Sequence, residues 1–167
     1  MNLYAKLQAR AATNTPIRVG MIGAGKFGSM FLAQAIKLPG IHIVAICDID
    51  IGRAKSNLAH IGWPKDRYAA TSFDDALKNL TTFLTDHSEL LMNCPHIDII
   101  IECTGNPLAA VAHAVAAFAS QKHVINATVE ADAFCGPGLA AAAHEAGVIY
   151  SMAYGDQPAL VCDLVDW

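Results

Sequence analysis

The sequence lacks the features that would direct the protein to a membrane or to nucleic acid. Although 54% of its 167 residues are hydrophobic, the longest purely apolar runs fall far short of the ~20 residues that span a bilayer. The N-terminal stretch "MNLYAKLQARAATNTP" has no continuous apolar segment of the secretory type. The net charge is −4 and the basic residues are scattered. We therefore expect a cytoplasmic protein without a membrane or nucleic-acid partner.

Patterns typical of metal sites and disulfides are missing as well. The sequence has 5 cysteines without C-x-x-C spacing, and 7 histidines without an H-x-x-x-H or H-E-x-x-H pair. Most of the cysteines lie in apolar segments, where reduced cysteine behaves as a small core residue. The sequence therefore predicts neither a disulfide framework nor a metal site of its own.

What the chain does contain is an alternation of short β-branched runs with helical segments. We expect buried strands at 17–22, 41–47, 97–103, 123–127 and 148–152, and helices at 27–37, 50–61, 108–120 and 138–146. Between them we expect a short strand at 67–71, a helix at 72–84 and an insertion at 85–95. This alternation predicts an α/β protein with a doubly wound parallel sheet, the arrangement of the Rossmann fold.

Two flanking segments stand outside the alternation. Spaced apolar residues at 2–12 predict a short accessory helix, so we assign residues 1–15 to an N-terminal helical arm and 16–157 to the Rossmann domain. Residues 158–167, "PALVCDLVDW", are apolar around most of a helix and end without a stop signal. We expect them to begin a helix that leads to a catalytic domain absent from this chain. The chain alone should then be inactive and should self-associate as a homo-oligomer.

The glycine-rich segment "GAGKFG", residues 23–28, joins the first strand to the first long helix. In a dinucleotide-binding unit the three glycines allow the turn, the approach of the pyrophosphate, and close helix–strand packing. Gly23, Gly25 and Gly28 fit these roles. Asp48 ends the second strand at the spacing of the carboxylate that binds the adenosine ribose. The alternative, a plain glycine turn, would require neither this order of elements nor this carboxylate.

The charges around Asp48 leave the choice between NAD and NADP open, with NAD favoured. Asp48 would repel a 2′-phosphate, whereas Arg53, and Lys26 with it, could bind one. The alternative for Arg53 is a solvated charge on a helix. After the fourth strand, Thr104, Gly105 and Asn106 could line the nicotinamide side of the site, and the alternative there is a simple helix N-cap.

Several carboxylates follow the later strands. Glu130 and Asp132 in "VEAD", and Asp156 in "GDQP", could face the substrate or a divalent metal. The alternative is that they cap helices or bind backbone amides. Glu102 lies inside a buried strand, where an unpaired carboxylate is costly. We favour a paired, structural role for Glu102 over a catalytic one.

Nearly the whole chain resembles the N-terminal half of the homoserine dehydrogenase-like oxidoreductases. The resemblance rests on "VGMIGAGKFG", "AICDIDIGRA", "IIIECTGNP", "KHVINATVEAD" and "GDQPALVCDLVDW". The last two segments are closer to a subgroup that includes the 1-deoxy-D-xylulose 5-phosphate reductoisomerase-like enzymes, in which catalytic and often SAF domains follow. The resemblance implies an NAD(P) cofactor surrounded by Gly23, Gly25, Lys26, Phe27, Gly28, Asp48, Arg53, Thr104, Gly105 and Asn126.

One departure from the family pattern concerns Asn126. Homoserine dehydrogenases usually carry an Asn-Lys pair after the fifth strand, whereas here Ala127 follows Asn126. The resemblance implies hydride transfer to or from a small hydroxy or carbonyl substrate, and this departure favours a reductoisomerase-like enzyme as the alternative to homoserine oxidation. A divalent metal would enter only with the absent domain. A third hypothesis is a non-catalytic module that senses NAD(P).

Overall fold

Six parallel strands form the centre of the structure, a computed structural model in which residues 2–153 are described. Their order across the sheet is β3-β2-β1-β4-β5-β6. The strands are β1 (Ile17–Ile22), β2 (Ile41–Cys47), β3 (Phe83–Thr85), β4 (Ile99–Glu102), β5 (His123–Asn126) and β6 (Tyr150–Met152). The helices are α1 (Leu3–Ala12), α2 (Lys26–Ala35), α3 (Ile51–His60), the 3-10 helix η1 (Lys65–Tyr68), α4 (Phe73–Asn79), α5 (Ser88–Asn93), α6 (Pro107–Ala119) and α7 (Val129–Ala146).

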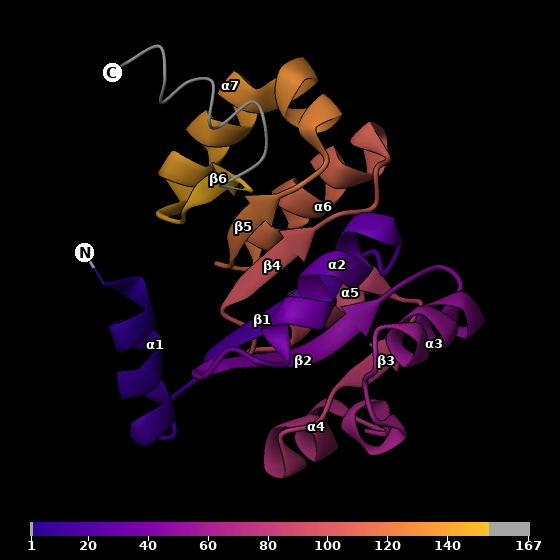
Figure 1. The fold of residues 1–167 in the computed structure, drawn as a ribbon. Coiled ribbons are helices and arrows are strands. Elements are labelled where there is room, and N and C mark those ends of the chain that lie inside the picture. The colour runs from indigo at the N-terminus through magenta and orange to yellow at the C-terminus, as the bar shows by residue number, and fades with distance from the viewer. Residues whose placement is uncertain (1, 154–167) are drawn as a thin grey trace.

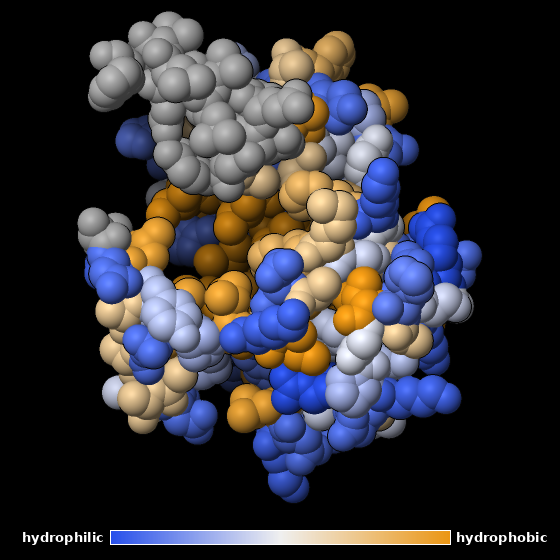
Figure 2. All heavy atoms as spheres, viewed as in Figure 1, coloured by the Kyte–Doolittle hydropathy of each residue, from blue (hydrophilic) through white to orange (hydrophobic). Residues whose placement is uncertain are grey.

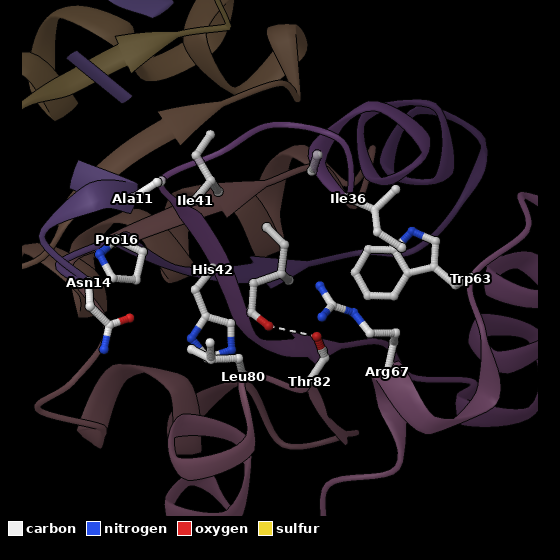
Figure 3. Close-up of a pocket in the computed structure, with 13 residues that line it drawn as sticks. Ala11, Asn14, Pro16, Ile36, Ile41, His42, Trp63, Arg67, Leu80 and Thr82 are labelled. Atoms are coloured by element: carbon white, nitrogen blue, oxygen red, sulfur yellow. Dashed lines mark hydrogen bonds between the residues drawn. The ribbon is translucent and has the colours of Figure 1, made fainter. Parts of the chain in front are cut away.

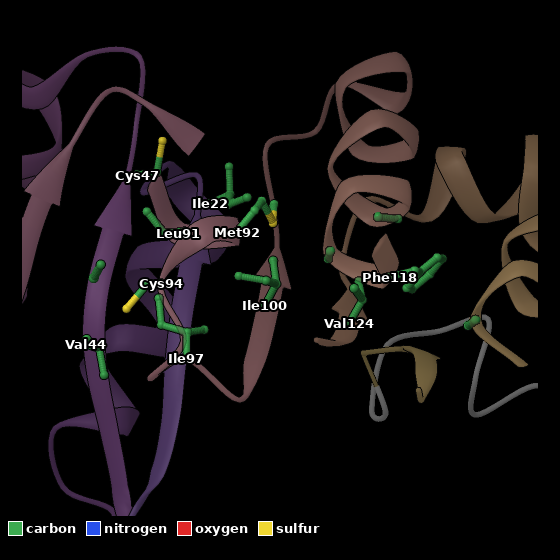
Figure 4. Packing of buried hydrophobic residues seen from close by; sticks show 14 of the residues in the cluster. Ile22, Val44, Cys47, Leu91, Met92, Cys94, Ile97, Ile100, Phe118 and Val124 are labelled. Carbon is green, nitrogen blue, oxygen red and sulfur yellow. The ribbon is translucent and has the colours of Figure 1, made fainter. Parts of the chain in front are cut away.

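Helices cover both faces of the sheet (Figure 1), which is why the central strands are apolar on both sides. On one face, α2 and α3 bury Leu32 and Leu58 against Met21 of β1. On the other face, α5, α6 and α7 pack their buried side chains against the strands (Figure 4), with Leu91 and Phe118 fully enclosed. This arrangement confirms the predicted doubly wound Rossmann fold.

The N-terminal helix α1 stands beside the sheet instead of covering it (Figure 1). None of its residues is buried. It meets the body of the protein at Gly40, where a Cβ atom would collide with the carbonyl group of Leu7 and where φ is +71°. Figure 2 shows a hollow with a hydrophobic floor between α1 and the strands, and hydrophilic residues gathered over the opposite side of that view. Within the described residues, no helix is long and apolar enough to cross a membrane.

The capping signals in the sequence locate several helix ends correctly. The Ser72 hydroxyl accepts a hydrogen bond from the Asp75 amide at 3.1 Å and begins α4. Pro107 is the first residue of α6, and Gly147 ends α7 with φ +70°. Each residue acts through local backbone chemistry, which is why the sequence alone was sufficient.

The segment between β2 and β4 differs from the prediction. No strand forms at 67–71, where η1 and a single bridge from Ala70 to Phe83 stand instead. The helix expected over 72–84 ends at Asn79, because Leu80 turns the chain with φ +53° and the apolar run beginning at Phe83 joins the sheet as β3. The expected insertion at 85–95 holds the end of β3 and the helix α5.

The helix α7 is twice as long as the helix expected over 138–146, because it begins at Val129 and continues through Pro137. Ala131, Leu139 and Ala143 recur at helical spacing and are buried, so packing against the neighbouring elements holds the helix across the proline. As a consequence, Glu130 and Asp132 lie in the first turn of α7 and not in a separate loop.

Candidate cofactor-binding site

A cleft of about 460 Å³ opens at the carboxyl ends of β1, β2 and β4. Between β1 and β4 the order of the strands reverses, and ligands of open α/β sheets bind at such a point. The cleft is lined by Ile22, Gly23, Gly25, Cys47, Asp48, Ile49, Arg53, Asp86, Ser88, Cys103, Thr104, Asn106, Ala109 and His113. Five of the ten predicted cofactor residues are among them.

The three glycines of the 23–28 loop have three different surroundings. Gly23 has φ +96°, and a Cβ atom there would collide with the backbone of Cys103. A Cβ atom at Gly28 would collide with the Gly23 carbonyl and with Met21. At Gly25, by contrast, nothing lies within 4 Å of an added Cβ atom. The first and third glycines are therefore required by the protein itself, whereas the second faces open space in the cleft.

The N-terminus of α2 opens onto this space. Its N-cap is Gly25, and no side chain caps the helix. The first amides of a helix have no partners within the helix, and together with the helix dipole they attract anions. This arrangement fits a dinucleotide pyrophosphate, because Gly25 has no side chain and leaves room for the phosphates beside the first amides of α2.

Side chains from three other elements hold the glycine loop in place. The Ala24 backbone amide donates a hydrogen bond to the Asp48 carboxylate at 2.8 Å. The Asn57 side-chain amide donates to the Ala24 backbone carbonyl at 2.7 Å. The Cys103 thiol donates to the Gly23 carbonyl at 2.9 Å. The loop is therefore fixed before a ligand binds, which reduces the ordering cost of binding.

Asp48 is buried, and its carboxylate already has several partners. Besides Ala24, it accepts hydrogen bonds from the Asp50 amide at 2.9 Å and from the Arg53 guanidinium at 3.0 Å. The Asp48 side chain is only 4% exposed, while that of Arg53 is 54% exposed. Arg53 is therefore an ion-pair partner of Asp48 and not merely a solvated charge. A ribose hydroxyl would have to share the carboxylate with Arg53.

The other end of the cleft is organised by Glu102, a fully buried carboxyl group at the end of β4. It accepts hydrogen bonds from the hydroxyl of Thr104 at 2.6 Å and from that of Thr128 at 2.5 Å. His113 of α6, which lines the cleft, lies 3.4 Å from the same carboxyl group. Glu102 is thus paired, as we expected, and it joins the β4–α6 turn to the β5–α7 turn.

The remaining predicted residues lie outside the cleft lining. Lys26 and Phe27 are exposed in the first turn of α2, and Gly28 is buried beneath that turn. Gly105 donates its amide to the Thr128 hydroxyl at 3.1 Å. Asn126 is 2% exposed, and its side-chain amide donates to the Thr128 carbonyl and to the Tyr150 hydroxyl. Asn126 therefore supports the turn after β5 from within the protein.

The candidate carboxylates that the structure describes have different surroundings. Glu130 is exposed in the first turn of α7, whereas Asp132 accepts a hydrogen bond from the Tyr150 hydroxyl at 3.1 Å. Asp156 lies outside the described residues. In the part of the chain that the structure describes, no group of three or more His, Cys, Asp or Glu side chains could hold a metal ion. The N-cap of α6 is Asn106, whose side chain accepts from the Ala109 amide.

Sequence reasoning missed several residues that shape the site. Asp86 and Ser88 line the cleft from the segment that we expected to be an insertion. Asn57 and Thr128 act through contacts distant in sequence, 33 residues to Ala24 and 26 residues to Glu102. His113 could have been found, because it follows Asn106 by two helical turns and therefore lies on the same face of α6.

The two cysteines of the cleft are not activated nucleophiles. Burial, with a smaller contribution from the charge of Asp48, raises the pKa of Cys47 to about 12. Burial also raises the pKa of Cys103 far above its usual range. Because the thiolate is the reactive form, neither residue is suited to covalent chemistry near neutral pH.

Comparison with known proteins agrees with this geometry. The GFO/IDH/MocA pattern, which describes an oxidoreductase family with an NAD-binding Rossmann fold, matches residues 17–127. The chain belongs to this family. The match includes the glycine loop, Asp48 and the β4–α6 turn, and ends beside Thr128. No curated protein sequence matches the chain.

Solved structures of similar fold include several oxidoreductases. A homoserine dehydrogenase from Thiobacillus denitrificans is 24% identical with a TM-score of 0.65, over 82% of this chain and 29% of its own. GenD2 from gentamicin A biosynthesis, solved in complex with NAD, is 16% identical with a TM-score of 0.61, and the match covers 82% of this chain and 34% of GenD2. An NAD-binding oxidoreductase from Klebsiella pneumoniae is 22% identical with a TM-score of 0.60, and the match covers 90% of this chain and 38% of that protein. These identities show a shared fold, and the chain spans about a third of the length of these proteins.

Proposed function

We propose that this chain is the cofactor-binding domain of an NAD-dependent oxidoreductase that transfers a hydride to or from a small hydroxy or carbonyl compound. One observation carries the proposal: the uncapped N-terminus of α2 and the open space at Gly25 lie in one cleft with Asp48 and His113. A dinucleotide needs a pyrophosphate site between a ribose site and a nicotinamide site, and we assign these to Gly25, Asp48 and His113 respectively.

In this proposal the residues of the chain bind and orient the cofactor. The amides at the start of α2 bind the pyrophosphate, and Asp48 accepts from the adenosine ribose. Thr104 and His113, held by Glu102, line the nicotinamide half of the cleft. When bound, the nicotinamide supplies the hydride chemistry, and the protein supplies position and a shielded environment.

The proposal favours NAD over NADP. The ion pair with Arg53 partly neutralises Asp48, but the buried carboxylate stays at the ribose position and would repel a 2′-phosphate. Titration calorimetry with both cofactors would test this, using Asp48→Ser and, as a matched control, Asp50→Ser. Both variants lose one negative charge, and serine at position 50 can still cap α3.

We expect the wild-type chain to bind NAD roughly tenfold or more tightly than NADP, and Asp48→Ser to remove most of that preference. Asp50→Ser should retain it. An unchanged preference in Asp48→Ser would contradict the assignment of Asp48 and would make Arg53 the residue to test next. Because the comparison is a ratio between two ligands, a general loss of stability in a variant would not imitate the result.

The substrate class has two candidates. Homoserine is one, on the resemblance to homoserine dehydrogenases, and 1-deoxy-D-xylulose 5-phosphate is the alternative, since Ala127 follows Asn126. The assay follows the absorbance of the nicotinamide cofactor after each compound is added. It compares this chain alone with the full polypeptide that contains it. We expect turnover only in the full polypeptide, as a homo-oligomer whose other domain supplies the acid–base groups and any divalent metal. Cofactor binding without turnover of any hydroxy or carbonyl substrate would favour an NAD(P)-sensing module.

A further inference from the structure

A second cavity, of about 210 Å³ (Figure 3), lies at the start of β1 and β2, whereas the cofactor cleft lies at their carboxyl ends. It is lined by the end of α1 and the link after it, the end of α2, the start of β2, η1 and the segment after α4. No residue lines both cavities. A molecule bound here would therefore contact none of the residues that line the cofactor cleft.

Arg67 brings a positive charge to this cavity. Its backbone is fixed, because its amide donates to the Pro64 carbonyl at 3.0 Å and its carbonyl accepts from the Thr82 amide at 2.8 Å. Its guanidinium, directed toward the middle of the cavity (Figure 3), has no hydrogen-bond or ion-pair partner among the described residues. A guanidinium presents a planar fork of donors that matches a carboxylate.

His42 provides a neutral polar group opposite Arg67. Its Nε2 atom lies 2.8 Å from the Thr81 carbonyl, so Nε2 carries the proton and Nδ1 is left as an acceptor. Among the described residues no buried side-chain nitrogen or oxygen lacks a partner, so the unbonded Nδ1 must reach solvent-accessible space. Burial, together with the charge of Arg67, lowers the pKa of His42 and keeps the imidazole uncharged near neutral pH.

Asn14 and Thr82 also line the cavity, and the remaining wall is apolar. Trp63 is 5% exposed, and its ring is anchored by the indole N–H, which donates to the Leu32 carbonyl at 3.1 Å. Ile41 and Pro16 form the facing wall (Figure 3). The volume is below the roughly 300–1,000 Å³ of pockets that hold drug-sized ligands, so only a small molecule fits.

We propose that this cavity binds a small organic monocarboxylate, with the carboxylate on the Arg67 guanidinium and a short aliphatic chain against Trp63 and Ile41. The charge selects an anion and the size excludes nucleotides. The apolar part of the wall, formed by Trp63, Ile41 and Pro16, favours a carbon chain over inorganic phosphate. The proposal does not depend on the cofactor site.

The test is a titration of the isotope-labelled chain with 4-methylpentanoate, followed by amide correlation spectra. We expect saturable shifts at the Trp63 indole N–H and at the Thr82 amide, with millimolar affinity. The uncharged analogue 4-methylpentanamide should bind roughly tenfold more weakly or worse, because it cannot pair with a guanidinium.

Two variants of η1 complete the experiment. Arg67→Gln and Lys65→Gln each remove one positive charge from the same 3-10 helix, but only Arg67 lines the cavity. Arg67→Gln should weaken binding of the carboxylate roughly tenfold or more, and Lys65→Gln should leave it unchanged. The proposal is overturned by the absence of saturable shifts, by equal binding of carboxylate and amide to the wild-type chain, or by shifts centred on Gly25 and Asp48. The comparison of the two ligands uses the wild-type chain and holds even if a variant fails to fold.

Discussion

Replacing Thr128 by valine tests whether Glu102 is a structural anchor of the β4–α6 side of the cleft. The Thr128 hydroxyl is the partner of Glu102 Oε2, and it also accepts the Gly105 amide at 3.1 Å. Thr128 is 1% exposed, so water cannot replace these contacts without a rearrangement. Leaving one buried oxygen and one partly buried amide unsatisfied should cost about 2–4 kcal/mol of unfolding free energy. For a chain of this length that is a loss of roughly 5–15 °C in melting temperature.

The matched control is Thr104→Val, which removes the other hydroxyl bound to Glu102, at 2.6 Å. Thr104 is exposed, so water can take over its role and the loss should be about 1 kcal/mol or less. Urea unfolding at neutral pH measures both variants. If Thr104→Val destabilised the chain as much as Thr128→Val, or if Thr128→Val had no effect, the buried network would not hold these turns together and the reasoning would be refuted.

Two further predictions concern charge and reactivity. Burial opposes the ionisation of Asp98, but its hydrogen bonds from Arg18 outweigh burial and lower its pKa in the folded state. The ionised Asp98 side chain therefore stabilises the folded state fully at pH values above its pKa in the unfolded chain. This stabilisation is lost as the pH falls through its pKa in the folded chain. Asp98→Asn should lower the free energy of unfolding, measured with urea at pH 7, by roughly 0.5–1 kcal/mol. The difference between the variant and the wild-type chain should disappear in acid. A difference that grew in acid would contradict the direction of the pKa change. With a pKa of about 12, Cys47 should have a thiolate fraction on the order of 10⁻⁴ at pH 8, so peptide mapping after iodoacetamide treatment should find it unmodified until the chain is denatured. Rapid modification of the native chain would show that the carboxyl end of β2 is open.

The sequence was sufficient wherever structure follows from local chemistry. The β-branched runs of β1, β2 and β4 need helices on both faces, and the glycines at 23–28 correctly predicted a tight strand–loop–helix connection. It failed where packing overrides a local signal. The helix expected over 138–146 begins instead at Val129, and its buried face continues through Pro137. Phe83 was expected near the end of a helix, but it pairs with β2 as part of β3.

Within the candidate site, the same division separates backbone roles from side-chain roles. The glycines and Asp48 were predictable because their spacing along one βαβ unit determines where they lie. Asp86, Asn57 and Thr128 were not, because each reaches the site through a contact between distant segments. Asn126 and Asp48 show a further limit, since their hydrogen-bond partners within the protein could not be known before the fold.

The central claim, that the cleft holds a dinucleotide at the Gly23–Gly28 loop, is tested most directly by NAD titration calorimetry of Gly25→Val. Gly25 has φ −72° and nothing lies within 4 Å of an added Cβ atom, so the variant should fold with the stability of the wild-type chain. A valine side chain would nevertheless occupy the space of the pyrophosphate. We predict that NAD affinity falls roughly a hundredfold or more while the melting temperature of the ligand-free chain stays the same. Unchanged NAD affinity in a folded Gly25→Val chain would contradict the account.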